Sequence, residues 1–397
     1  MADDQLPPAV RSLMGAGTQL VRSTTSGRIG LAQAHALVDP ATVPARLRGL
    51  ITEELEAAAA KVAPIDAETV VAILKDAWGQ DPRKVVDDLD LDAPLAVTPG
   101  AQVHRATLDS GPVAVKVLRP GVSESIRSDL GLLETLKGPA GAAFPAIDAG
   151  VLIREARERV LDELDLEHEA ATQRTAARAL RRHAAIAVPL PVSDLCHERV
   201  LVAAFVEGPT LADELPAGED AGAIARTLLA AAMGLPRTAG LVHADIAPGN
   251  VIVTGPGTIA LVDFGATCRV ERVRLDLGLD ALAALREDDE DGFVTAVIGL
   301  GVFEDPELAG AALRLLRAVG GELLTGPARL DADALLALAE RAEAHTREFF
   351  ALARQAALDP RDLWPLRMLA TLVSTLARLG TTEDWIALAV AAGREGC

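Results

Sequence analysis

Residues Leu241 to Arg269 read LVHADIAPGNVIVTGPGTIALVDFGATCR, and this stretch decides the fold. It predicts a loop followed by a short strand, because an apolar β-branched run begins at Val251. Gly255-Pro256-Gly257 then predicts a turn, and Thr258 to Val262 a second short strand.

Three polar side chains flank these strands at fixed distances. Asp245 and Asn250 are five residues apart in the loop, and Asp263 follows Asn250 by thirteen residues, at the start of Asp-Phe-Gly. A D-F-G alone is common, but H-x-D-x-x-x-x-N together with D-F-G is the spacing of a kinase-like catalytic loop. We expect Asn250 and Asp263 to bind Mg²⁺ and Asp245 to act as base or to orient the nucleophile. His243 is expected to fix the loop backbone.

The bulk composition narrows the class of protein. Half of the 397 residues are hydrophobic, which predicts a globular chain of two or three domains. The formal net charge of −19 argues against nucleic acid as a partner, since phosphate backbones repel an acidic chain. The three cysteines are scattered and predict neither a disulfide framework nor a zinc site, as in a reducing compartment.

Targeting signals are not evident in the sequence. The acidic N-terminus lacks the apolar core of a signal peptide, and the most apolar window, 363–379, is interrupted by Arg367 and Arg378. We therefore expect a cytoplasmic protein without a transmembrane segment, leaving peripheral membrane contact open. The oligomeric state is not predicted.

The first 90 residues have a helical pattern. Apolar residues recur at helical spacing in four segments, at Ala9–Arg22, Arg28–Val38, Pro44–Val62 and Ala67–Trp78. Asp66 is expected to cap the last of them. This region is interpreted as a helical extension without chemistry of its own.

The pattern then changes to strands, at Ala101–Leu108 and Val113–Leu118, joined by a turn. Val113-Ala114-Val115-Lys116 matches the kinase strand whose lysine reaches the α- and β-phosphates. An ammonium on a buried strand requires a neutralising partner. The alternative is a lysine that extends to solvent from a strand end.

A long helical stretch, Ala149–His183, carries six acids, most of them expected on a solvated face. One glutamate is expected to pair with Lys116, as in kinase-like folds, and Glu163 and Glu158 are the preferred candidates. Strands at Val188–Val192 and Val200–Phe205 complete a small sheet, and Glu207-Gly208-Pro209 is interpreted as a hinge.

The predicted fold is α+β and two-lobed, like a protein kinase. It has a helical extension at 1–90, a small β-rich N-lobe at 91–207 and a mostly helical C-lobe at 208–397. The helices expected around and after the hinge are Ala221–Leu235, Arg274–Arg286, Asp289–Leu300, Pro306–Gly320, Ala332–Leu358, Pro360–Leu379 and Thr382–Gly393.

Several runs of residues resemble one family. HADIAPGN at 243–250 is similar to the H-x-D-x-x-P-G-N loop of the UbiB, or AarF-type and ADCK-like, atypical kinase-like proteins. AQVHRA at 101–106, VAVKVLRPGV at 113–122 and Glu163-Leu164-Asp165 with Glu169-Ala170 resemble other motifs of that family in the same order. The match covers roughly residues 28–300. It implies ATP and Mg²⁺ as cofactors and nucleotide contacts from Lys116, Glu158, Glu163, Asp165, Thr98, Gly100 and Gln102.

The sequence also departs from that family. Its alanine-rich loop before the first strand is here Ala96-Val97-Thr98-Pro99-Gly100, and proline lacks an amide donor. Its K-x-G-Q motif, thought to restrain protein-kinase activity, falls at Arg28-Ile29-Gly30-Leu31. The Asn that usually follows the E-x-D motif is Thr172, and the family's C-terminal membrane segment has no counterpart.

Three functional hypotheses follow. The first is a Mg²⁺-dependent, ATP-binding ATPase of the UbiB type, for which the resemblance implies a role in isoprenoid-quinone or lipid metabolism and a lipid or isoprenoid partner. The second is a nucleotide-binding regulator with little turnover, because Pro99 alters the phosphate loop. The third is a kinase that acts on a small molecule or a protein.

Overall fold

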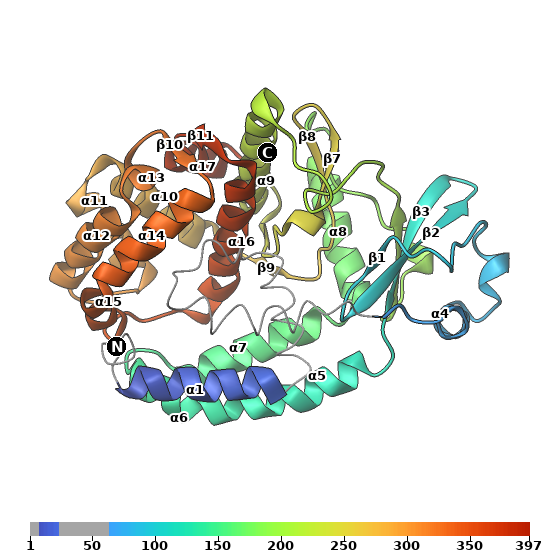
Figure 1. The fold of residues 1–397 in the computed structure, drawn as a ribbon, viewed down its shortest axis with the longest axis horizontal. Coiled ribbons are helices and arrows are strands. Elements are labelled where there is room, and N and C mark those ends of the chain that lie inside the picture. Colours follow the sequence, from blue (N-terminus) through green and yellow to red (C-terminus); the bar gives the residue numbers. More distant parts are fainter. Residues whose placement is uncertain (1–7, 24–62) are drawn as a thin grey trace.

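A four-stranded antiparallel sheet forms the core of the smaller lobe in the computed structural model, which describes residues 8–23 and 63–397 (Figure 1). The strand order is β1-β2-β3-β5, with β1 at Ala96–Val97, β2 at Ala101–Leu108, β3 at Gly111–Leu118 and β5 at Val200–Ala204. In the β2–β3 register, Val103 pairs with Lys116 and Gln102 with Val117. Because strand side chains alternate, Lys116 and Gln102 lie on opposite faces of the sheet.

A helix covers each face of this sheet. Helix α4 (Ala67–Trp78) packs on the face of Val113, Val115 and Val117, and Asp66 caps it as predicted by accepting a hydrogen bond from the Thr69 amide. Helix α8 (Leu166–Leu180) packs on the other face, the one that carries Lys116. The division of the chain at residue 90 stays a prediction.

Four helices form a layer along one edge of the molecule, at the bottom of Figure 1. They are α1 (Pro8–Ser23), α5 (Val122–Leu130), α6 (Lys137–Ala143) and α7 (Ala149–Asp162). Helix α1 agrees with the predicted segment and packs against α6. The helices expected at 28–38 and 44–62, and the Arg28–Leu31 motif, lie outside the described residues.

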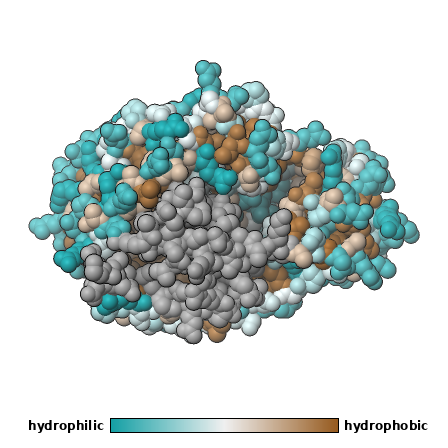
Figure 2. Space-filling view, viewed as in Figure 1, coloured by the Kyte–Doolittle hydropathy of each residue, from teal (hydrophilic) through white to brown (hydrophobic). Residues whose placement is uncertain are grey.

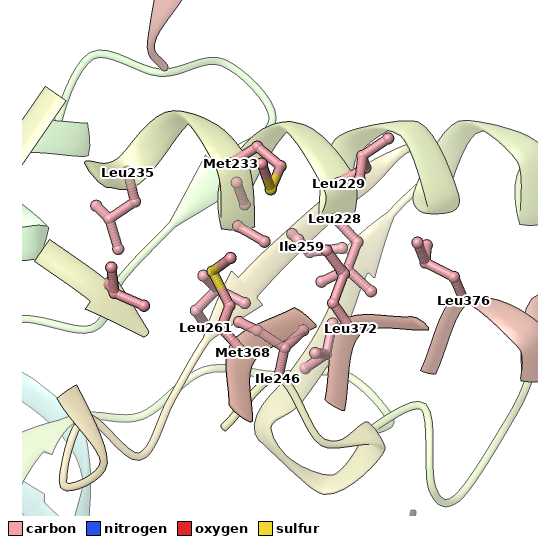
Figure 3. Packing of buried hydrophobic residues seen from close by; sticks show 14 of the residues in the cluster. Leu228, Leu229, Met233, Leu235, Ile246, Ile259, Leu261, Met368, Leu372 and Leu376 are labelled. Carbon is pink, nitrogen blue, oxygen red and sulfur yellow. The ribbon is translucent and has the colours of Figure 1, made fainter. Parts of the chain in front are cut away.

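The larger lobe is helical and is built around α9 (Gly218–Ala239). Figure 3 shows Leu228 and Met233 of α9 packed with Ile259 and Leu261 and with Met368 and Leu372 of α16 (Leu363–Leu379). The other helices are α10 (Arg272–Glu287), α11 (Glu290–Leu300), α12 (Pro306–Gly320), α13 (Glu322–Thr325), α14 (Ala332–Ala344), α15 (Thr346–Ala353) and α17 (Trp385–Glu395). The described residues thus confirm the α+β class, with one β-rich lobe and one helical lobe.

Short strands line the junction of the lobes. The hairpin β7 (Val251–Gly255) and β8 (Thr258–Leu261) pairs through β8 with β4 (Ile186–Ala187), and β6 (Leu241–His243) pairs with β9 (Thr267–Arg269). Strands β10 (Ala328–Leu330) and β11 (Thr381–Glu383) form a separate pair.

The segment that links the lobes runs beside β7. The Val253 amide donates to the Pro209 carbonyl at 2.9 Å, and the Leu211 amide donates to the Val251 carbonyl at 3.0 Å. Gly208, just before this pairing, has φ 139°, and a Cβ there would lie 2.2 Å from the Val253 carbonyl oxygen. Only glycine fits this position without a shift of the backbone.

Three predicted elements are wrong. The predicted helix Ala332–Leu358 is two helices, α14 and α15, because the helical backbone is interrupted at His345, and α15 ends at Ala353. The segment Val188–Val192 is not a strand, since Pro189 and Pro191 lack the amides that a ladder needs. The predicted helix Ala149–His183 is two helices, because the chain turns at 163–165 and Asp165 starts a new helix. Helices α5 and α6 and the pair β10–β11 were not predicted.

Hydrophilic side chains dominate the outer margins of both lobes on the face shown in Figure 2, in keeping with the acidic composition. Within residues 8–23 and 63–397, no helix is both long enough and apolar enough to span a bilayer.

Candidate active site

The β7–β8 hairpin places Asn250 beside the Asp263 segment. Val251 pairs with Leu261, so the residue before the first strand lies next to the residues after the second. The Val262 amide donates to the Asn250 carbonyl at 3.0 Å. Asp263 then adopts φ 61°, a left-handed conformation that is uncommon for residues other than glycine and is often found at functional sites. The hairpin therefore brings Asn250 and Asp263 close together, although thirteen positions separate them in the sequence.

Lys116 connects the two lobes through two carboxylates. Its Nζ lies 2.9 and 3.0 Å from the Glu169 oxygens and 2.9 Å from Asp263 Oδ1. The side chains of Lys116 and Glu169 are 17% and 2% exposed, whereas that of Asp263 is 43% exposed and open to solvent. The alternative of a lysine extending into water is wrong, because the ammonium lies between two acids.

The prediction that Lys116 pairs with Glu163 or Glu158 is also wrong. Glu158 is exposed on α7, and Glu163 forms an ion pair with Arg367 instead. Glu169 takes the role because it lies in the first turn of α8, on the face that packs against the sheet.

Asp165 sets the start of that helix. Its Oδ1 accepts hydrogen bonds from the amides of Glu167 at 2.9 Å and His168 at 3.1 Å, which is a typical N-cap arrangement. Asp165 is therefore a helix cap in this structure, and the expected nucleotide contact from Asp165 stays a prediction. The cap acts on the site indirectly, since it fixes where Glu169 lies along the helix.

Arg367 is a second cation of the site, which the sequence reasoning missed. Its Nη1 donates to Glu163 Oε1 at 2.8 Å, and its Nη2 lies 3.8 Å from Asp245 Oδ2. The three side chains are only 15–26% exposed. In the sequence, Arg367 only interrupts an apolar window. Nothing in that window indicates that the arginine contacts Glu163 and Asp245.

The shared ammonium moves the pKa values of its partners apart. Burial raises the pKa of Glu169 to about 7, an effect that Lys116 opposes and Asp263 adds to. The partial burial of Asp263 would also raise its pKa, but the Lys116 ammonium outweighs this effect and holds that pKa below its usual range. Burial would lower the pKa of Lys116, but the carboxylates of Asp263 and Glu169 outweigh this effect and raise that pKa above its usual value. Glu169 is therefore the member of this trio that takes up a proton most readily as the pH falls.

Asp245 lies in a less favourable electrostatic environment. Burial raises its pKa, the Arg367 guanidinium and a hydrogen bond with the Asn250 side chain oppose that rise, and the Asp263 carboxylate adds to it. The pKa of Glu163 is raised in the same way, by burial first, with Arg367 opposing. The Arg367 guanidinium is thus the largest influence that favours the charged form of both carboxylates.

His243 supports the loop backbone, as expected. The Asp245 amide donates to its Nδ1 at 3.3 Å, so its Nε2 carries the proton and donates to the Val262 carbonyl at 3.1 Å. Burial lowers the pKa of this imidazole, which keeps it neutral. The ring also packs edge-on against Phe264, with 4.6 Å between centroids.

The turn between β1 and β2 has few free amides. The Thr98 amide donates to the Ala101 carbonyl at 2.9 Å, and the Ala101 amide donates to Thr98 Oγ1 at 3.0 Å. Pro99 has no N–H to donate. Gly100 is therefore the position of this turn whose N–H could still bind a phosphate. Nucleotide contacts from Thr98 and Gly100 stay predictions.

Gln102 does not face the ion cluster. Its side chain is fully buried, its Oε1 accepts from the Ile65 amide at 2.7 Å and its Nε2 lies 2.9 Å from His104 Nε2. It therefore ties the sheet to the segment before α4, on the face opposite Lys116. The expected nucleotide contact from Gln102 is wrong.

The site has the charge balance and the donor atoms that suit a divalent cation. When all its acids are ionised it carries two positive and four negative charges, from Lys116 and Arg367 and from Glu163, Glu169, Asp245 and Asp263. Among the described residues, no group of three or more His, Cys, Asp or Glu is arranged to hold a metal. Asn250 and Asp263 supply two hard oxygens, and Mg²⁺ commonly takes its remaining ligands from water and phosphate.

Sequence comparison identifies the family. The ABC1 atypical kinase-like domain matches residues 58–297, more than half of the chain. The chain belongs to the ABC1 atypical kinase-like family. The resemblance to UbiB and AarF-type proteins is thereby confirmed, and so is the kinase-like fold of this ABC1 chain.

Curated relatives of this ABC1 chain include the probable protein kinase UbiB of Marinobacter nauticus, 32% identical over 231 residues, which are 54% of this chain and 41% of the relative. AarF domain-containing protein kinase 1 of Mus musculus is 34% identical over 210 residues, 50% of this chain and 40% of the relative. The chain thus spans about two fifths of these relatives. The solved complex of Rv3197 with erythromycin, from Mycobacterium tuberculosis, has a TM-score of 0.61 and covers 91% of this chain and 89% of its own. At 23% identity, that likeness concerns the fold alone.

Proposed function

We propose that this chain binds ATP with Mg²⁺ between its lobes and catalyses phosphoryl transfer, with water as the simplest acceptor. The observation that carries the proposal is the contact of Lys116 with Glu169 and Asp263 at 2.9 Å. Asn250 is bonded to the Asp245 carbonyl and to the amide of Val262, the residue before Asp263. Kinase-like enzymes place a strand lysine, a helix glutamate and the D-F-G aspartate in this relation.

Each residue has a role that follows from its chemistry. Lys116 neutralises phosphate charge, and Glu169 holds the lysine in place. Asn250 and Asp263 would hold Mg²⁺, which supplies charge neutralisation at the phosphate oxygens. Asp245 lies where a base or an orienting group for the attacking hydroxyl is needed.

A nucleotide-binding regulator with little turnover is the second candidate. The β1–β2 turn supports it, because the amides of Thr98 and Ala101 bond inside the turn and Pro99 has none. Phosphates bound here would depend on Lys116 and the metal more than on loop amides.

The acceptor and the pathway are finer proposals. Family membership and the UbiB resemblance support a role in isoprenoid-quinone or lipid metabolism, with an isoprenoid or lipid small molecule as partner. This part of the proposal rests on analogy with relatives of which the chain covers less than half.

Phosphate release from ATP tests the enzymatic function. The purified chain is assayed with MgCl₂ as wild type, as Asp263→Asn and as Asp109→Asn, a control in the exposed β2–β3 turn. We expect turnover in wild type and Asp109→Asn and its loss in Asp263→Asn. Equal background phosphate release by wild type and both variants contradicts the proposed enzymatic function. Binding of a fluorescent ATP analogue by that inactive protein supports the regulator.

The fate of the γ-phosphate separates an ATPase from a kinase. ATP labelled at the γ-position is incubated with the chain and with protein, lipid and sugar fractions. Label that appears only as free phosphate supports an ATPase. Transfer to one fraction that is lost in Asp263→Asn supports a kinase and names the class of its acceptor.

A further inference from the structure

Helix α16 runs along the catalytic loop and contacts it at three successive turns. Arg367, Thr371 and Thr375 are four residues apart, so their side chains share one face of the helix. Thr371 Oγ1 accepts from the Ile246 amide at 3.1 Å, and Thr375 Oγ1 donates to the Ile246 carbonyl at 2.6 Å. One helix therefore fixes both polar backbone groups of the residue after Asp245.

Ile246 is also held through its side chain. It is fully buried, and Figure 3 shows it close to Met368 and Leu372 of α16. These contacts fix the backbone of the loop but do not reach the Asp245 side chain. Asn250 is a side-chain hydrogen-bond partner of the Asp245 carboxylate, and a contact with a cation adds to this restraint.

Arg367 provides that contact. Its guanidinium is 2.8 Å from Glu163 Oε1 and 3.8 Å from Asp245 Oδ2, and it lies 5.7 Å from the centre of the Trp364 ring. Glu163 and Trp364 thus fix a planar cation in position, and the cation faces Asp245. The loop from His243 to Asn250 contains no Lys or Arg of its own.

The charges around Asp245 make this contact consequential. The Lys116 ammonium is already bonded to Glu169 and Asp263. The carboxylates of Asp263 and Glu163 repel that of Asp245, and like charges at short range in a partly buried site are costly. Without the guanidinium, the Asp245 carboxylate would turn away from them and out of its place in the site.

We propose that Arg367 is a positioning residue for phosphoryl transfer, which holds the Asp245 carboxylate in place with Glu163 as its anchor. This inference rests on the proposed function, because Asp245 is taken as the residue that orients the acceptor. It adds a residue from the last part of the chain, beyond the 58–297 domain match, to the catalytic arrangement. The α16 helix then couples the C-terminal region to the catalytic loop.

Turnover of three variants tests the proposal. Arg367→Met removes the charge with similar volume, Arg367→Lys keeps a cation, and Arg378→Met is a control on the exposed side of the same helix. We expect Arg367→Met to lower kcat about tenfold or more, since a misplacement of about 1 Å can cost roughly 100-fold. The affinity for a fluorescent ATP analogue should change less than about twofold, because Lys116 and the metal residues are untouched. Arg367→Lys should recover part of kcat, and Arg378→Met should match wild type.

A structure of Arg367→Met gives a readout that does not need turnover. We expect the Asp245 carboxylate to be displaced while Ile246 keeps its bonds to Thr371 and Thr375. An unmoved carboxylate, an unchanged kcat, or a loss of kcat matched by an equal loss of nucleotide binding overturns the proposal. Absence of turnover in wild type contradicts the proposed function instead, and the position of the carboxylate then still decides whether Arg367 holds it.

Discussion

The Lys116 ammonium lies 2.9 Å from Asp263 Oδ1 although 147 positions separate the two residues along the chain. One residue belongs to the sheet of the small lobe and the other follows the hairpin at the lobe junction. A single ion pair therefore reports whether the two halves of the site are correctly assembled.

Replacing Lys116 should affect stability and activity separately. Lys116→Met leaves the nearly buried Glu169 without its cation, and breaking such a pair costs about 3 kcal/mol. The double variant Lys116→Met with Glu169→Gln should regain most of that stability and remain inactive. Chemical unfolding and phosphate release measure the two effects, with the exposed Lys84→Met as control. Recovery of turnover in the double variant would contradict the role of the lysine.

The raised pKa of Glu169 predicts a pH dependence of stability. In the folded chain the Glu169 carboxyl keeps its proton up to about pH 7, whereas a glutamate in the unfolded chain releases its proton at about pH 4.3. Between these values the folded state holds more protons, so raising the pH lowers the free energy of unfolding. Measured without metal or nucleotide, the stability of wild type relative to Glu169→Gln should fall from pH 5 to pH 8. A difference that stays constant or grows with pH counts against the assigned protonation.

The proposed role of Asn250 as a metal ligand predicts how turnover depends on the Mg²⁺ concentration. Asn250→Ala removes an oxygen ligand and should raise the Mg²⁺ concentration for half-maximal turnover about tenfold, whereas Asn250→Asp keeps the oxygen. Titration of phosphate release with MgCl₂ measures this. Because Asn250 Nδ2 also donates to the Asp245 carbonyl at 3.1 Å, thermal unfolding of each variant is the control. Equal Mg²⁺ requirements in wild type and Asn250→Ala would exclude it as a ligand.

The close approach of Gly208 to β7 predicts that a larger residue at this position destabilises the fold. A Cβ at this position would lie 2.2 Å from the Val253 carbonyl oxygen, at φ 139°. We expect Gly208→Ala to lower the free energy of unfolding by roughly 2 kcal/mol or more. Gly278→Ala is the matched control, because that glycine lies inside α10 with open space around it, and alanine there should stabilise by about 0.5–1 kcal/mol. Similar melting temperatures for Gly208→Ala and wild type would be inconsistent with the described linker.

Regular elements were predictable because their patterns are local. Strand Ala101–Leu108 and helix Pro306–Gly320 agree with the predicted bounds, since alternation and helical spacing are visible in each segment alone. The strand expected at Val188–Val192 rested on its apolar residues, but the two prolines within the segment remove the amides that a ladder needs.

The ion pairs of the site were harder to predict because they depend on helix phase and on distant packing. Glu169 lies on the buried face of α8 with Leu166, Ala170 and Gln173, at spacings of three and four residues. That stripe was visible in the sequence and would have favoured Glu169 over Glu163. Arg367 left no comparable signal, because only the packing of α16 on the catalytic loop brings it to Asp245.

The linker that runs beside β7 also limits how this chain can be divided. Residues 209–211 cover the open edge of the β7–β8 hairpin with backbone hydrogen bonds, so they serve as part of the larger lobe. A fragment that began after Leu211 would expose unpaired amides and carbonyls along β7, which are a template for aggregation. A separately expressed C-terminal lobe should therefore begin no later than Pro209.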